Sequence, residues 1–375
     1  MNDYNITDIL RIAKRHNNNK RSYLLVNPLQ GKHLPVSPTV ALHMMKTLGD
    51  KIASKYPDTK LVIGFAETAT AIGAMVADSL AKDCIYIHTT RENFSDDYNF
   101  IDFLEEHSHA PEQSLYSDKL SDWLQHTSTV VFVDDELSTG RTLRNIIHQL
   151  KFKYPALNDK RLVAASIINR LSSENEKLFH SAGIDCEYLV KLSEQDFDVS
   201  DIITQAPKIL NSLTEPIDNK ILFYGINSLP NPRLGVHIYN YINELNLLGN
   251  KILSLVDDSR SILVLGTEEC MLPAIITGKI LEDNGYNVVT HSTTRSPIGI
   301  GYHNNYPITE GYQLKSFYDT NRTTYIYNLK YYDLVLVISD IADWKSESIQ
   351  SLIAALSVHG YGKVIFIGGN NVQHL

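Results

Sequence analysis

The segment 130–142 constrains the fold of this chain more than any other. A short apolar run over 130–133 predicts a buried strand, and two carboxylates, Asp134 and Asp135, follow at its carboxyl end. The sequence Ser-Thr-Gly-Arg-Thr comes next, and then an amphipathic pattern that predicts a helix over about 143–154. A strand, an acidic edge, a glycine turn and a helix start, in this order, predict one βα unit of an α/β protein.

The order of these residues also predicts a ligand. Ligands of open parallel sheets bind beyond the carboxyl ends of the strands, so Asp134 and Asp135 are expected in a site. The turn can aim N–H groups at a phosphate, and the helix start adds its positive end. It consists of Leu137, Ser138, Thr139, Gly140, Arg141 and Thr142. Two carboxylates beside a phosphate-binding turn suit a sugar phosphate, because the acids accept hydrogen bonds from vicinal hydroxyls.

Composition narrows the class of protein. With 375 residues, 43% of them hydrophobic, the chain can build two or three domains with large cores. A formal net charge of -9 gives no basic field for nucleic acid. The 3 cysteines are far apart, no signal-peptide pattern is present, and no apolar run approaches the ~20 residues that span a bilayer. We therefore expect a cytoplasmic protein that binds neither membrane nor nucleic acid.

Segment 130–142 resembles the signature of type I phosphoribosyltransferases, which bind 5-phosphoribosyl-1-pyrophosphate (PRPP). The resemblance implies that Asp134 and Asp135 hold the ribose hydroxyls, that residues 137–142 anchor the 5-phosphate, and that Mg²⁺ accompanies the pyrophosphate beside the two acids. Neither a Walker motif nor a dinucleotide-binding glycine fingerprint occurs in the chain. Some purine enzymes of the family carry an aspartate where this chain has Ser138, so a 6-oxopurine acceptor is less expected.

The same resemblance assigns roles to other parts of the first half. A strand ending near Gly64 precedes a small-residue loop, Glu67-Thr68-Ala69, in the position of the family's pyrophosphate loop, although Glu67 also suits a plain helix start. Arg91, in the polar tip of a third strand over 85–92, would reach the pyrophosphate or make a surface salt bridge.

Two further segments complete the expected site. The polar segment 93–126 corresponds to the family's mobile catalytic loop, and it offers His107 and His109 where relatives carry Lys or Arg. These histidines are either catalytic or loop residues without a role. The proline-rich segment 27–38 corresponds to the hood over the acceptor, with Lys32 and His33 as acceptor-binding residues.

The second half repeats the order of the first. Strands ending at Gly266, near Arg295 and at Asp340 follow their counterparts at Gly64, Arg91 and Asp134 by about 200 positions, which favours internal duplication over chance similarity. No Thr-Gly-x-Thr follows Asp340, so this copy should not bind PRPP. The residues expected to line its cleft, or to serve as caps and salt bridges, are Glu268, Glu269, His291, Arg295 and Ser296.

The sequence Thr-Arg-Ser-Pro at 294–297 resembles the motif that names the TRSP domain, which follows a phosphoribosyltransferase domain in a family associated with tellurite-resistance-type stress operons. We thus expect a phosphoribosyltransferase domain over 1–215 and a second α/β domain, a degenerate copy, over 216–375. The expected function is transfer of phosphoribosyl from PRPP to a small-molecule acceptor, a nitrogen heterocycle. The alternatives are a PRPP sensor without catalysis, or a second activity in the C-terminal domain. A homodimer is compatible with either.

Overall fold

The computed structural model describes residues 4–17, 21–93, 97–103, 113–193, 196–210, 220–226, 229–257, 259–369 and 371–373. The chain forms two compact units, each assembled from separate segments. The first unit comprises Met1–Ile6, His43–Gln195 and Pro230–Asn243, and the second comprises Thr7–Leu42, Asp196–Leu229 and Glu244–Leu375. The domain boundary expected at 215 lies outside the described residues, and it stays a prediction.

The first unit is built on a six-stranded sheet with the order β11-β4-β3-β7-β8-β9, parallel except for the short edge strand β11. The strands are β3 (Thr59–Gly64), β4 (Ile85–His88), β7 (Thr129–Leu137), β8 (Arg161–Asn169), β9 (Ile184–Lys191) and β11 (Val236–His237), with a separate pair β5 (Phe100–Phe103) and β6 (Gln113–Tyr116). The helices are α3 (Thr70–Asp78), α4 (Leu120–Gln125), α5 (Arg141–Lys153), α6 (Ser173–Ser181) and the 3₁₀ helices η1 (Pro155–Asp159) and η2 (Pro232–Leu234). Helices α1 (Ile6–Ile9), α2 (Pro38–Lys55) and α7 (Ile238–Leu253) contain residues of both units.

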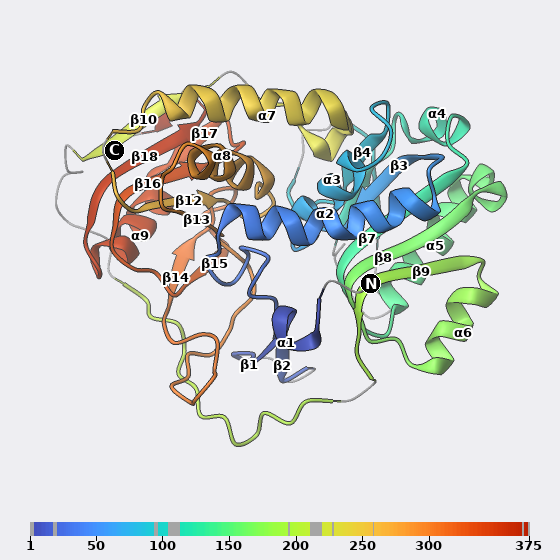
Figure 1. Cartoon of the computed structure of the whole chain (residues 1–375), viewed down its shortest axis with the longest axis horizontal. Helices are drawn as coiled ribbons and strands as arrows, with labels where there is room; N and C mark the ends of the chain where they lie inside the picture. Colours follow the sequence, from blue (N-terminus) through green and yellow to red (C-terminus); the bar gives the residue numbers. More distant parts are fainter. Residues whose placement is uncertain are drawn as a thin grey trace. The chain divides into compact units, whose positions relative to one another are not determined.

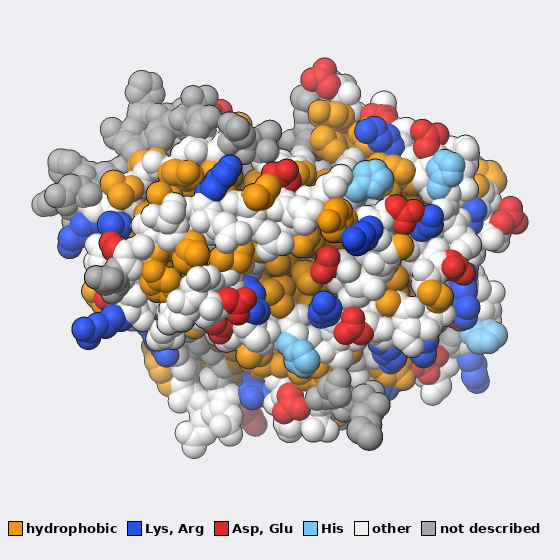
Figure 2. Space-filling view, turned by 45° about the horizontal axis from the view of Figure 1, so that its top comes forward, with side chains coloured by type: hydrophobic (Ala, Val, Ile, Leu, Met, Phe, Trp, Pro, Cys, Tyr) orange, Lys and Arg blue, Asp and Glu red, His pale blue; other side chains and the backbone are white. Residues whose placement is uncertain are grey.

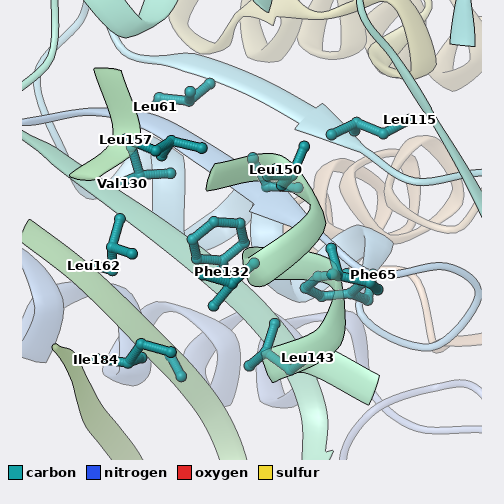
Figure 3. Packing of buried hydrophobic residues seen from close by; sticks show 14 of the residues in the cluster. Leu61, Phe65, Leu115, Val130, Phe132, Leu143, Leu150, Leu157, Leu162 and Ile184 are labelled. Atoms are coloured by element: carbon teal, nitrogen blue, oxygen red, sulfur yellow. The ribbon is translucent and has the colours of Figure 1, made fainter. Parts of the chain in front are cut away.

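Apolar side chains on one face of this sheet form a continuous core. Phe132 of β7 packs in a cluster with Leu143 and Leu150 of α5 and with Leu162 of β8 (Figure 3). Each such side chain contributes about 1.5–3 kcal/mol when it is fully buried. The core fixes β7 against α5, and the turn that joins them is therefore held in place.

The second unit contains a fully parallel five-stranded sheet with the order β10-β18-β16-β12-β13. Its strands are β10 (Ile221–Gly225), β12 (Ile262–Gly266), β13 (Val288–Ser292), β16 (Tyr332–Ile338) and β18 (Tyr361–Gly368). The pairs β1 (Arg11–Lys14) with β2 (Tyr23–Val26), β14 (Gly311–Lys315) with β15 (Thr323–Tyr327), and β17 (Asp343–Lys345) with β19 (Asn371–Gln373) are smaller. Helices α8 (Leu272–Asp283) and α9 (Ser346–Ser357) complete it.

Alternation along the strands gives the second sheet two apolar faces. Ile262 and Val264 of β12 belong to the cluster that contains residues of α7 and α8, whereas Leu263 and Leu265 belong to the cluster with α9 and the β14–β15 pair. Figure 1 shows the strands of this sheet together with helices α8 and α9. A sheet covered on both faces is typical of parallel α/β architecture. The expected α/β class is confirmed for both units.

The two sheets share a connection pattern. In the first unit β3 lies between β4 and β7, and in the second β12 lies between β13 and β16. In each sheet the chain therefore passes first to the neighbour on one side of this strand and later to the neighbour on its other side. The strand register changes one of the equivalences that the sequence spacing suggested between the two halves. Gly64 of β3 pairs with Val133 of β7, and Gly266 of β12 pairs with Ile338 of β16. The counterpart of Asp340 is therefore Asp135, one residue later than spacing had suggested.

Several predicted elements are confirmed, with altered limits. Strand β7 continues through the acidic residues to Leu137, because β8 extends alongside and pairs with Asp134 and Glu136. Helix α3 begins at Thr70, directly after the small-residue loop, and ends at Asp78. The polar segment 93–126 was expected to be a mobile loop, yet its described residues contain β5, β6 and α4, since Phe103, Leu115 and Leu120 are buried in the core.

The surface and the thiols agree with the composition. On the face drawn in Figure 2, Lys and Arg side chains lie interspersed with Asp and Glu. All three cysteines are free thiols. No helix in the described part of the chain is both long enough and apolar enough to cross a membrane.

Candidate active site

The acidic residues of β7 form the centre of the candidate site. Asp134 and Asp135 are half-buried, and the N–H of Asp135 donates to Oδ1 of Asp134 at 2.9 Å. Burial, followed by the neighbouring Asp135 carboxylate, raises the pKa of Asp134 well above its ordinary value. The pair resists carrying two negative charges, so hydroxyl donors or a cation brought by a ligand would favour its ionised form.

The loop after β3 reaches this pair. The hydroxyl of Thr68 donates to Oδ1 of Asp135 at 2.8 Å, which joins the loops on the two sides of the switch point. The loop is also tied to the end of β4, because Oγ1 of Thr89 accepts from the N–H of Ala66 at 2.9 Å. The Ala66–Glu67 peptide bond is cis, and Glu67 is buried. Three neighbouring strands thus hold the loop that contains Glu67, Thr68 and Ala69.

The turn between β7 and α5 requires glycine. Gly140 has φ +65 at the N-cap of α5, and a Cβ atom there would lie 2.3 Å from Cε2 of Phe179. Thr139, Arg141 and Thr142 are exposed around it, whereas Leu137 is buried and Ser138 is half-buried. The leading N–H groups of α5 lack intrahelical acceptors, and this end of the helix suits an anion.

An ion pair that the sequence analysis missed supports the strand ends. Nη1 of Arg170, directly after β8, lies 3.1 Å from Oε1 of Glu136, and the two side chains are only 7% and 12% exposed. The N–H of Arg170 also donates to the carbonyl oxygen of Leu137 at 2.7 Å. The sequence contained a signal for this pair. Arg170 follows one predicted strand, and three acids, 134–136, follow the preceding one, so an arginine–carboxylate pair at these strand ends could have been predicted.

The other predicted residues of the PRPP site are Arg91, His107, His109, Lys32 and His33. Arg91 is exposed after β4, and His107 and His109 lie outside the described residues, so their catalytic roles stay predictions. Lys32 and His33 belong to the second unit. The Lys32 ammonium donates to the carbonyl oxygens of Glu268 and Thr293 at 2.8 and 3.1 Å, and its role in acceptor binding stays a prediction.

The predicted cleft residues of the second unit form two groups. The first group is Glu268 and Arg295. Glu268 is fully buried, and its Oε2 lies 3.2 Å from Nε of Arg295. The second group is His291 and Ser296, which both contact Tyr327. Nε2 of His291 lies 2.9 Å from the carbonyl oxygen of Tyr327, and the hydroxyl of Tyr327 donates to the carbonyl oxygen of Ser296. Glu269 is also buried.

The described residues contain no group of three or more His, Cys, Asp or Glu side chains placed to hold a metal ion. Asp134 and Asp135 alone would supply one or two carboxylates. That donor set fits Mg²⁺, which keeps several waters and takes further ligands from substrate phosphates.

Fold and site together define an α/β protein with an acidic pair and a glycine turn at a helix start, at the switch point of a parallel sheet. The family model described as "Phosphoribosyl transferase" matches residues 9–194, and the model described as "TRSP domain C terminus to PRTase_2" matches residues 233–356. The chain belongs to the phosphoribosyltransferase family and carries a TRSP domain after its phosphoribosyltransferase domain.

Solved structures with partial similarity include three phosphoribosyltransferases. The adenine enzyme of Trypanosoma brucei, in complex with AMP, pyrophosphate and ribose-5-phosphate, is 15% identical over 52% of this chain and 86% of its own, with a TM-score of 0.35. The adenine enzyme of Rhodothermus marinus is 13% identical over 50% and 96%, with a TM-score of 0.36. The orotate enzyme of Aeropyrum pernix is 17% identical over 48% and 88%, with a TM-score of 0.32. No curated protein matches the chain.

Proposed function

We propose that the first unit transfers the 5-phosphoribosyl group of PRPP to a small-molecule acceptor, a nitrogen heterocycle, and releases pyrophosphate. One observation carries this proposal: an acidic pair leads directly into a glycine turn and a helix start, at the switch point between β3 and β7. Family membership agrees with it.

Each part of the site has a role in this reaction. Asp134 and Asp135 accept hydrogen bonds from the ribose hydroxyls and fix the ring, while the turn at Gly140 anchors the 5-phosphate. Binding energy from the phosphate, which does not react, then orients the anomeric carbon. Thr68 positions Asp135 through its hydrogen bond, and the loop around it faces the leaving pyrophosphate. The developing positive charge on the ribose ring lies beside the carboxylates, which stabilise it.

Asp134 and Asp135 are also the residues that would hold Mg²⁺ together with the pyrophosphate. When bound, the ion supplies neutralisation of the negative charge that develops on the leaving group. The two carboxylates must be ionised for this role. The raised pKa of Asp134 implies that the free site favours ligands that arrive with a cation.

The test is release of pyrophosphate by the full-length chain with PRPP, Mg²⁺ and a panel of nitrogen heterocycles, measured with a coupled pyrophosphatase assay. We expect turnover with one class of acceptor and its loss in the variant Asp134→Asn/Asp135→Asn. Tight PRPP binding without pyrophosphate release for any acceptor would support the alternative of a PRPP sensor. Absence of PRPP binding would contradict both.

A further inference from the structure

The second unit repeats a hydrogen-bond arrangement of the first. In the first unit, the N–H of Thr89 donates to the carbonyl oxygen of Gly64 at 2.9 Å, and its Oγ1 accepts from the N–H of Ala66 at 2.9 Å. In the second unit, Thr293 makes the same two bonds, to Gly266 at 3.1 Å and from Glu268 at 3.0 Å. The loops after β3 and β12 are therefore held alike, and Glu268 stands in the place of a small alanine.

Glu268, in the loop after β12, forms ion pairs with two arginines. Its carboxylate is fully buried and lies 3.2 Å from Nε of Arg295 and 3.1 Å from Nη1 of Arg322, while Oε1 accepts from the hydroxyl of Ser316 at 2.6 Å. Its backbone has φ 48, a conformation that is costly for a residue with a side chain. The two arginines keep 17% and 21% of their side-chain surface exposed. One carboxylate thus holds two guanidinium groups side by side at a switch point, where ligands of α/β sheets bind.

A second observation comes from the N-terminal segment. His33 is 2% exposed, and among the described residues neither of its ring nitrogens has a hydrogen-bond partner. Burial, with the charge of Lys32, lowers the pKa of His33 to about 3, so its ring is neutral and can donate at one nitrogen and accept at the other. Lys32 contacts the peptides of Glu268 and Thr293, which places this segment at the same strand ends. A buried polar group of this kind requires an explanation, and a bound ligand supplies one.

Acidic side chains at the same end restrict the kind of ligand. Oδ2 of Asp319 lies 3.8 Å from Nη2 of Arg322, and the hydroxyl of Tyr318 donates to Oδ1 of Asp340. Glu269 is buried in the loop after β12. Carboxylates beside a cationic pair disfavour a bare inorganic dianion, but they suit a phosphate ester that also carries hydroxyl groups.

We propose that the second unit binds a small sugar phosphate, with Arg295 and Arg322 on the phosphate and His33 on an uncharged polar group. Glu268 is a positioning residue that holds the two guanidinium groups next to one carboxylate. This site goes beyond the proposed transferase function, because it needs neither PRPP nor turnover in the first unit.

The experiment is calorimetric titration of the full-length chain with ribose 5-phosphate, and separately with inorganic phosphate. We expect two ribose 5-phosphate sites per chain, one in each unit. Arg295→Gln/Arg322→Gln should weaken one of them by roughly tenfold or more, because charge-assisted bidentate contacts are lost. Arg260→Gln, an exposed arginine before the amino end of β12, is the matched control and should keep both sites.

Removing both arginines leaves the buried Glu268 carboxylate without them, so the triple variant with Glu268→Gln is measured beside it, and thermal melting verifies that each is folded. The single variant Glu268→Gln tests whether the Glu268 carboxylate positions the two arginines for the phosphate or competes with the phosphate for them. Loss of a negative charge should by itself tighten anion binding, whereas loss of a positioning contact should weaken it, and we expect weakening.

Three results would overturn the proposal: two unaltered sites in folded variants that lack both arginines, tighter binding in Glu268→Gln, or inorganic phosphate binding as tightly as ribose 5-phosphate. None of them bears on pyrophosphate release by the first unit, so this proposal and the transferase proposal fail separately.

Discussion

At the residue scale, the turn after β7 depends on Gly140. Its positive φ and the contact with Phe179 are two separate reasons why alanine does not fit. Gly183 offers a matched control, because it has φ +71 and no atom within 4 Å of a built Cβ.

Gly183→Ala should therefore lower the free energy of unfolding by about 1 kcal/mol, through φ alone. Gly140→Ala should cost a further 1–3 kcal/mol, roughly, because the methyl group overpacks the contact with Phe179. Urea denaturation of both variants measures the difference. Equal losses would mean that α6, which carries Phe179, moves away at little cost.

The acidic pair gives a second test at this scale. Asp134→Asn with Asp135→Asn should weaken PRPP binding by roughly 2–4 kcal/mol, since hydrogen bonds to charged groups contribute ~1.5–3 kcal/mol each. Calorimetry measures the change. The control removes two exposed acids, with Asp58→Asn and Asp159→Asn, and should leave the affinity unaltered. Unchanged affinity in the first variant would remove the ribose-binding role.

At the scale of elements, β7 and β8 are joined beyond the apolar core by the pair Arg170–Glu136. Because both side chains are largely buried, Arg170→Met leaves a carboxylate without this partner and should cost about 3–5 kcal/mol of stability. The exposed pair Lys60–Asp83 is the comparison, and Lys60→Met should leave the unfolding free energy nearly unchanged. A small loss for Arg170→Met in thermal or urea unfolding would show that water reaches the pair.

The contact of segment 27–36 with β13 should be sensitive to pH. Burial lowers the pKa of His33 to about 3 and that of His291 to about 4, from 6.5. Both rings stay neutral in the folded protein while the unfolded chain binds protons below pH 6.5. Above that pH this difference in protonation has no effect, and below it the folded state is progressively destabilised, down to about pH 4 for His291 and about pH 3 for His33.

At pH 5 each histidine should reduce stability by about 2 kcal/mol relative to pH 7. His33→Asn should remove its share of this dependence, measured by urea denaturation at both pH values, whereas the exposed His180→Asn should not. An unaltered pH dependence in His33→Asn would mean that this ring is protonated in the folded state.

At the scale of the whole molecule, each of the two compact units contains segments from separate parts of the sequence. Residues 7–42 belong to the second unit, where Ala13, Leu24 and Val26 pack in one cluster with Ile298 and Ile300. Residues 230–243 belong to the first, where β11 extends its sheet at β4. A single cut in the chain does not separate the units.

A fragment ending at residue 215 should therefore expose the apolar side chains of β1 and β2, since their partners are removed. We expect strong binding of a hydrophobic dye and concentration-dependent association in sedimentation. The shorter fragment 43–215, which lacks β1 and β2, should bind less dye. Equal dye binding by the two fragments would contradict the assignment of residues 7–42 to the second unit.

The sequence predicted the local parts of the site because they depend on neighbouring residues. Strand, acids, turn and helix over 130–142 follow from apolar periodicity and from the conformational freedom of Gly140, and β3, β12 and β16 follow from short apolar runs. Repeated spacing also indicated the shared order of strands.

Only the tertiary structure decided which distant segments meet. The ammonium of Lys32 contacts a peptide oxygen 236 positions away, and Arg322, 54 positions from Glu268, completes its arginine pair. No periodicity encodes such contacts, because they arise when whole elements pack and buried polar groups must find partners. Sequence by itself thus determined the α/β class, the family resemblance and the acidic turn, whereas packing decided that the N-terminal segment belongs to the second unit.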